Sequence, residues 1–186
     1  MTATSQIFWI NVFGLYCTAQ LFVNFFHFQN EDFESAQIAY AKVPVREVES
    51  DEKEEVLFKM GYSAFQNGDL ESSYDAFRDV KDGTTQYAKP SLYFYSHISY
   101  TKNALQVALE GFQKLRTDST FCGVVPYYIA QILHKQGKFQ EVIDLAPTVL
   151  SCSVVNNEAD IQHIIGDAYY QLAKYTEAIA YLEKYH

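Results

Sequence analysis

His163 and Asp167 lie four residues apart, so on a helix the imidazole and the carboxylate would share one face. Such a pair is the start of an acid–base site or supplies two ligands of a metal site. Neither chemistry is complete, because no nucleophile or third ligand stands at a matching spacing. The patterns GxxxxGK[ST], GxGxxG, GxSxG and HExxH are also absent from the sequence. We therefore expect no enzyme, no cofactor and no metal site, and interpret the pair as a hydrogen-bonded surface pair.

Aromatic side chains are the main anomaly of the composition. The 186 residues include 15 Tyr, 14 Phe and one Trp. Tyrosine joins an apolar ring to a hydroxyl, so it suits contact surfaces as well as cores. The net charge of -9, from 14 Lys and Arg against 23 Asp and Glu, argues against a nucleic-acid partner, which requires clustered basic residues.

A pattern of small and apolar residues recurs five times and defines the elements that carry these aromatic residues. The small or short side chains are separated by 37, 35, 34 and 36 residues: Asn24, Gly61, Ser96, Ala130 and Gly166. Nine residues after each comes a large apolar side chain: Phe33, Leu70, Leu105, Phe139 and Tyr175. Each unit therefore reads as two amphipathic helices that approach closely at the small positions.

The turns inside these units carry residues that favour a left-handed backbone, namely Gly68, Asn103 and Gly137. Ser50 and Asn156 or Asn157 are the expected N-caps of two first helices. The expected helix pairs are 17–28 with 31–42, 51–66 with 70–80, 89–101 with 104–115, 124–135 with 139–146, and 157–172 with 175–185. Pro147 should make the second helix of the fourth pair kink or stop early.

Two segments, KMGYSAFQNGDLESSYDAF at 59–77 and IIGDAYYQLAKYTEAIAYL at 164–182, resemble the tetratricopeptide repeat. The resemblance implies an all-α, right-handed α-solenoid of about five antiparallel helix pairs. The repeats would span about 17–43, 51–80, 87–115, 123–150 and 157–186. The stretches LYFYSHISY, VPYYIAQIL and GDAYYQLAKYTEAIAYLEKY resemble the tyrosine-rich region of large bacterial tetratricopeptide proteins of the cell envelope. That likeness favours the envelope or periplasm, with the cytoplasm as the alternative.

Tetratricopeptide arrays generally bind an extended peptide or a partner helix on their concave face, which the first helix of each unit lines. The resemblance therefore implies a non-catalytic protein–protein interaction scaffold with an aromatic and histidine-lined groove. The positions carried over to this groove are Phe58, Tyr62, Phe65, Tyr93, His97, Tyr100, Tyr127, Gln131, His134, His163, Asp167 and Tyr170. The alternative for each ring is packing between neighbouring repeats. The Lys, Asn and Arg clamp of chaperone-binding members is missing, which disfavours a terminal carboxylate as the anchor.

The two ends of the chain suggest a second function. Residues 1–16 are interpreted as an apolar leader or as the remnant of a preceding unit. The run 7–28 is long enough to span a bilayer, but polar residues interrupt it and no Lys or Arg precedes it, so a buried helix, a signal and a membrane anchor stay open. The last helix reaches His186 without a polar cap, which favours self-association. The alternative function is a structural spacer or a self-associating fragment of a longer repeat protein.

Two further features have a structural and a functional interpretation. The acidic run 46–55 is either a solvated loop and helix start or a surface for a basic partner. Cys122 and Cys152 flank the fourth helix pair, so they either form a disulfide in an oxidising compartment or remain two thiols.

Overall fold

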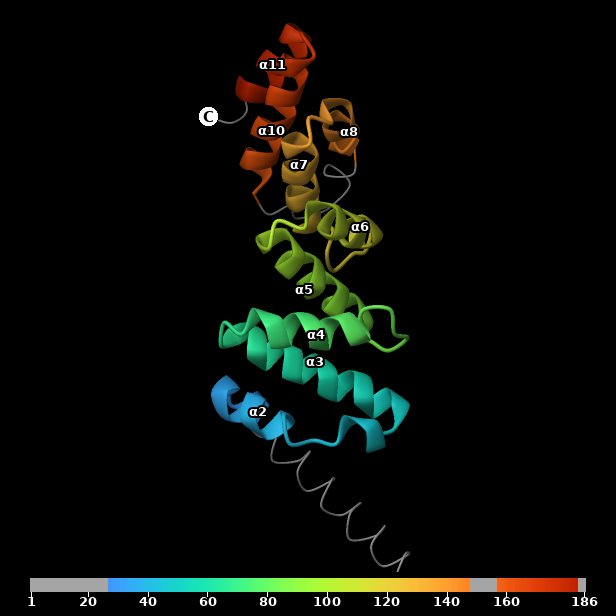
Figure 1. Ribbon diagram of the computed structural model, residues 1–186. Helices are drawn as coiled ribbons and strands as arrows, with labels where there is room; N and C mark the ends of the chain where they lie inside the picture. The colour runs from blue at the N-terminus through green and yellow to red at the C-terminus, as the bar shows by residue number, and fades with distance from the viewer. Residues whose placement is uncertain (1–26, 148–156, 184–186) are drawn as a thin grey trace, which may run out of the picture. The chain divides into compact units, whose positions relative to one another are not determined.

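A computed structural model describes residues 27–147 and 157–183, and all of their regular structure is helical. Figure 1 shows these helices in chain order. The elements are α2 (Phe33–Tyr40), the 3-10 helix η1 (Val45–Glu47), α3 (Ser50–Gln66), α4 (Leu70–Val80), α5 (Ala88–Thr101), α6 (Leu105–Leu115), α7 (Val125–Lys135), α8 (Phe139–Ile143), α10 (Glu158–Gln171) and α11 (Tyr175–Leu182).

The chain divides into two compact units, at residues 1–95 and 96–186. In the first unit α3 packs against α2 and α4. In the second unit α7 packs against α6, α8 and α10, and α10 also packs against α8 and α11. The predicted pairing is therefore present for α3 with α4, α7 with α8 and α10 with α11, and the described fold is all-α as expected.

The small residues lie where paired helices approach closely. A Cβ atom placed on Gly61 would be 3.1 Å from the Cβ of Ala76 and 3.1 Å from Cε1 of Phe77 on α4. A Cβ atom on Gly166 would be 2.8 Å from the end of the Leu182 side chain on α11. Glycine at these two positions therefore permits the separation between the helices of each pair.

One residue in each of five turns has a left-handed backbone. Their φ angles are 57° at Glu31, 79° at Gly68, 59° at Asn103, 70° at Gly137 and 57° at Ala173. The left-handed conformation predicted for Gly68, Asn103 and Gly137 is confirmed. Glu31 and Ala173 adopt the left-handed conformation at the same repeat position. This conformation is unfavourable for them, because both residues have a Cβ atom and glycine does not.

Aspartate caps that the sequence analysis missed begin two of the second helices. Asp32 accepts a hydrogen bond from the Ser35 amide at 3.2 Å, and Asp69 accepts one from the Ser72 amide at 3.1 Å. These hydrogen bonds lower the pKa of both carboxyl groups, because they stabilise the charged form. Because Asp32 is the N-cap, α2 begins two residues later than predicted.

Other helix ends also differ from the expected bounds. Helix α2 ends at Tyr40, before the turn that leads to Pro44. Helix α3 begins at Ser50 with Glu49 as its N-cap, so the predicted Ser50 cap is one residue too late. Asn157 is the N-cap of α10 as predicted, but its side chain makes no capping hydrogen bond.

The second helix of the fourth pair stops early, as its proline predicted. Helix α8 covers only Phe139–Ile143, and helical backbone resumes at Ala146, next to Pro147. A proline fits the first turn of a helix but not its interior, because it lacks an amide hydrogen. The expected leader at 1–16 and most of the helix expected at 17–28 lie outside the described residues. No helix in the described ranges is long and apolar enough to cross a membrane.

Candidate protein-interaction surface

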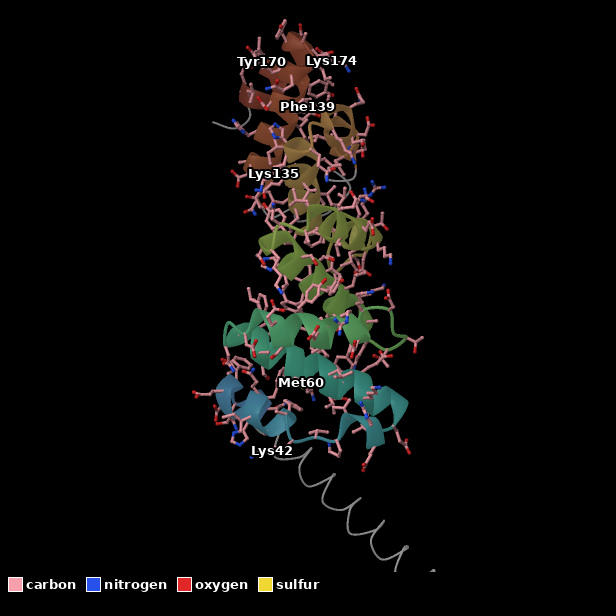
Figure 2. All side chains as sticks on the ribbon, viewed as in Figure 1. Lys42, Met60, Lys135, Phe139, Tyr170 and Lys174 are labelled. Carbon is pink, nitrogen blue, oxygen red and sulfur yellow. The ribbon has the colours of Figure 1, made fainter. Side chains whose placement is uncertain are left out.

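In the second unit, polar side chains of consecutive first helices meet. The hydroxyl of Tyr100 on α5 donates a hydrogen bond to Oε1 of Gln131 on α7. Lys135 Nζ donates to the same hydroxyl at 3.3 Å, and lies 5.0 Å from the centre of the Tyr100 ring. Figure 2 labels Lys135 on α7. The lysine therefore makes both a hydrogen bond and a cation–π contact with one tyrosine.

The next pair of first helices is joined in the same way. His134 Nε2 on α7 and Asp167 Oδ2 on α10 are 2.5 Å apart, and the imidazole donates to the carboxylate. Their side chains are 34% and 33% exposed, so both reach solvent. The ring of Phe139 is 5.4 Å from the His134 ring and nearly perpendicular to it. We call Tyr100, Gln131, His134 and Asp167 the polar ladder.

The polar ladder changes the interpretation of the histidine and aspartate on α10. Asp167 pairs with His134, one repeat earlier in the chain, and His163 is exposed. Within the described residues, no group of three His, Cys, Asp or Glu side chains is arranged to hold a metal ion. The arrangement of His134 and Asp167 therefore joins two helices through a hydrogen bond and offers partly exposed polar atoms.

The predicted groove residues of the first unit are largely packed against other rings. The Tyr62 ring centre is 5.7 Å from that of Phe28, 5.7 Å from Phe33, 6.2 Å from Phe58 and 5.5 Å from Phe94. Such edge-to-face and offset contacts stabilise the packing of neighbouring helices. For Tyr62, the structure therefore favours the packing interpretation that the sequence left open.

Phe94 and Tyr128 are two core rings that the sequence analysis did not single out. Phe94 stacks on Phe77 with ring centres 5.1 Å apart, and Tyr128 stacks on Phe112 with centres 4.9 Å apart. Each contact joins a second helix to the following first helix, and the two contacts recur at nearly the repeat spacing. A signal for these core rings is present in the sequence as two aromatic doublets, Tyr93-Phe94 and Tyr127-Tyr128. In each doublet the second ring packs against the preceding second helix.

The remaining predicted groove residues differ in how deeply they lie. Phe65 and Tyr93 contact the Phe94 ring, with centres 5.1 and 5.4 Å away. His97 is half-buried with its ring 5.5 Å from that of Tyr128, and burial lowers its pKa because it disfavours the charged form.

Two further groove tyrosines lie in the second unit. Tyr127 is half-buried and contacts the Tyr128 ring. Tyr170 is 57% exposed and lies near the turn that Lys174 follows (Figure 2). Its ring centre is 5.6 Å from that of Tyr175. These two rings combine exposure with a position on a first helix, which suits contact with a partner.

Cys122 is disulfide-bonded. Cys17 and Cys152 lie outside the described residues, so the pairing of Cys122 with Cys152 stays a prediction.

Comparison with known proteins agrees with the repeat pattern. A family model described as tetratricopeptide repeat matches residues 159–185, which include most of α10 and all of α11. The pair α10 and α11 therefore matches the tetratricopeptide repeat. No curated protein matches the sequence of this chain. Repeat arrays of this kind present extended surfaces to other proteins.

Solved structures of MamA share the fold of this chain. The "Crystal structure of MamA protein" is similar with a TM-score of 0.72 at 19% identity, covering 92% of this chain and 91% of that one. A second, "Crystal structure of MamA", has a TM-score of 0.69 at 20% identity, covering 88% and 92%. A third, "MamA AMB-1 P212121", has a TM-score of 0.71 at 15% identity, covering 92% and 91%.

Proposed function

We propose that this protein is a non-catalytic scaffold that holds an extended peptide, or a segment of a partner protein, along its first helices. The observation that carries the proposal is the polar ladder, which places partly exposed side chains of α5, α7 and α10 next to one another. Its hydrogen bonds fix the side chains before a partner arrives, so binding would cost less conformational entropy.

The chemistry of the polar ladder suits a peptide backbone. Gln131 retains amide hydrogens when its oxygen accepts from Tyr100, and Asp167 has a second carboxylate oxygen beside the one bound to His134. These groups are able to donate to peptide carbonyls and accept from peptide amides. Tyr127 and Tyr170 on the same helices add ring surface for apolar side chains of the partner.

The packing found in the first unit decides which variants test the proposal. Tyr62 contacts four other rings, so Tyr62→Ala would weaken the fold along with any binding. Tyr127→Ala combined with Tyr170→Ala removes one ring from α7 and one exposed ring from α10 instead. The matched control is Val107→Ala, because Val107 is an apolar residue of the second helix α6 that is 39% exposed.

The experiment selects peptides with the wild-type chain from a displayed random library and measures their dissociation constants for each variant. Interface aromatic residues contribute about 1 to 2 kcal/mol each, so the double variant should bind about thirtyfold more weakly or worse. The control should bind like the wild type, and circular dichroism should show unchanged helix content for all three. Equal affinity of the double variant would argue that partners do not use these helices.

A second candidate function, self-association, rests on the last hairpin. Tyr170, Leu172, Tyr175 and Ile179 are exposed by 57, 38, 57 and 56%. Adjacent exposed apolar side chains often mark a surface that another protein covers. Light scattering over a range of concentrations tests this function. The molecular mass of the wild-type chain should rise with concentration, whereas Ile179→Lys should keep the mass of a monomer. A monomer at all concentrations would reject it.

A further inference from the structure

The first unit contains an aromatic cavity between α2 and α3. Its volume is about 400 Å³, and it is lined by Phe28, Gln29, Glu31, Phe33, Phe58 and Tyr62. We call it the α2–α3 pocket. Three of its rings are arranged edge to face, with interplanar angles of 77° between Phe28 and Phe33, 62° between Phe28 and Tyr62, and 71° between Phe33 and Tyr62. The rings therefore form walls of different orientation.

We propose that the α2–α3 pocket binds the cationic side chain of an arginine or a lysine in a basic peptide. The inference rests on the proposed scaffold function, since Phe58 and Tyr62 belong to the predicted groove. It adds the chemical class of one partner side chain and the place where that side chain binds.

The ring walls provide the first reason. The face of an aromatic ring carries partial negative charge, and a cation within about 6 Å of the ring centre is attracted to it. The chain already uses one wall in this way, because Lys59 Nζ lies 5.8 Å from the centre of the Phe28 ring. That ammonium group is also paired with Glu55 and its side chain is only 10% exposed. A cation is therefore accepted beside these rings in the folded protein.

The carboxylate of Glu31 provides the second reason. Glu31 lines the pocket and is exposed, and no Lys, Arg or His of the described residues lies within ion-pair distance of it. It is held there by a left-handed backbone, with a φ of 57°, at the turn position that glycine occupies as Gly68 and Gly137. A neutral apolar guest would approach this carboxylate without compensating its charge, whereas a cationic guest pairs with it.

The charge distribution provides the third reason. Residues 27–95 contain 14 Asp and Glu against 7 Lys and Arg, while residues 96–186 contain 9 against 7. Most of the net negative charge therefore lies in the part of the chain that forms the α2–α3 pocket. Such an excess attracts a basic peptide before contact is made, and salt weakens this attraction.

A second cavity in the described part of this unit is a poorer candidate for a cation. It has a volume of about 320 Å³, and Asp75 and Asp79 of α4 are among its lining residues. Arg78 already pairs with both carboxylates, since its Nη1 is 2.8 Å from Asp75 and its Nε is 3.5 Å from Asp79. The acidic groups of that cavity are therefore compensated within the chain, unlike Glu31.

The test is a titration of the full chain with two peptides, followed by aromatic carbon–proton NMR. The peptides are acetyl-Gly-Ser-Arg-Ser-Gly-amide and the same peptide with citrulline, which keeps the shape of arginine but is neutral. The arginine peptide should shift the ring signals of Phe28, Phe33 and Tyr62. It should bind at least about fivefold more tightly than the citrulline peptide, because cation–π and carboxylate contacts are lost with the charge. Raising the salt concentration should reduce this difference.

Three variants localise the effect. Phe33→Leu keeps an apolar side chain but removes a ring face, and should weaken binding of the arginine peptide at least about threefold. Phe139→Leu changes the equivalent residue of the fourth helix pair and should leave this affinity unchanged. Glu31→Gln alters an exposed carboxylate without removing packed atoms, so it keeps the test valid even if Phe33→Leu is poorly folded. It should reduce the preference for arginine over citrulline.

Equal binding of the two peptides would overturn the proposal and assign the pocket to neutral groups. Signal changes confined to His134, Tyr127 and Tyr170 would also overturn it, but would leave the scaffold function standing with a different surface. If neither peptide changes any ring signal, the cationic pocket is rejected, while peptides selected from the library still decide the scaffold function independently.

Discussion

Replacing Ala173 by glycine should stabilise the protein, although it removes a side-chain atom. Ala173 lies between α10 and α11 with a φ of 57°, in a conformation that is about 1 to 2 kcal/mol unfavourable for a residue with a Cβ atom. Glycine removes this cost but loses about 0.5 to 1 kcal/mol through the greater freedom of the unfolded chain. The net gain should be about 0.5 to 1 kcal/mol.

The reciprocal change provides a matched control. Gly137 has a φ of 70° at the equivalent turn, and a Cβ atom placed on it would have no neighbouring atom within 4 Å. Gly137→Ala therefore introduces backbone strain without a steric clash, and should destabilise the chain by a similar amount. The opposite signs of the two changes separate the turn conformation from any general effect of glycine.

Urea unfolding followed by circular dichroism at 222 nm measures both effects, and thermal unfolding provides a second readout. For a chain of this length, 1 kcal/mol corresponds to about 2 to 4 °C in the melting temperature. Because repeat proteins can unfold in parts, amide hydrogen exchange in α11 should report the Ala173→Gly gain locally. A loss of stability in Ala173→Gly together with no cost in Gly137→Ala would refute the left-handed turn at this repeat position.

Three further predictions follow from packing, ionisation and cysteine chemistry. Gly61→Ala should lower the free energy of unfolding by about 1 to 2 kcal/mol in urea titrations, because its Cβ atom would press on Ala76 and Phe77. The better helix propensity of alanine would offset only part of this cost. Burial lowers the pKa of His97 below its usual 6.5, so the unfolded chain takes up a proton more readily than the folded one. Stability should thus be full above about pH 6.5 and decline as the pH falls through this value, and His97→Gln should lessen the decline in unfolding curves from pH 7.5 to 5. With Cys122 in a disulfide, a thiol assay of the unfolded chain should count one reactive thiol before reduction and three after it. Three reactive thiols before reduction would exclude the disulfide.

The helix pairing was predictable because it depends on residue types that are visible in the sequence of each helix pair. The spacing of Gly61 and Gly166 identified the close approaches, and the proline at 147 predicted the short α8. The start of α2, whose turn has no glycine, was less accurate. Glu31 was placed inside a helix, whereas it adopts the left-handed turn and leaves Asp32 as the cap.

The candidate surface was predictable only in part. The repeat positions placed Tyr100, Gln131, His134 and Asp167 on first helices. Which of these side chains touch depends on the distance and rotation between neighbouring helices, because the paired residues are 31 and 33 positions apart in the sequence. The sequence also did not distinguish a ring that faces a partner from one that packs. Tyr62 shows why, since its environment includes the rings of Phe28, Phe33 on α2 and Phe94 on α5.

The most direct test of the account is a crystal structure of the full chain bound to a peptide selected from the library. The scaffold function predicts an extended peptide or a helix lying along α5, α7 and α10, within hydrogen-bonding distance of Gln131 or Asp167 and in contact with Tyr127 or Tyr170. A peptide seated on the second helices α6 and α8, with the polar ladder facing solvent, would contradict it.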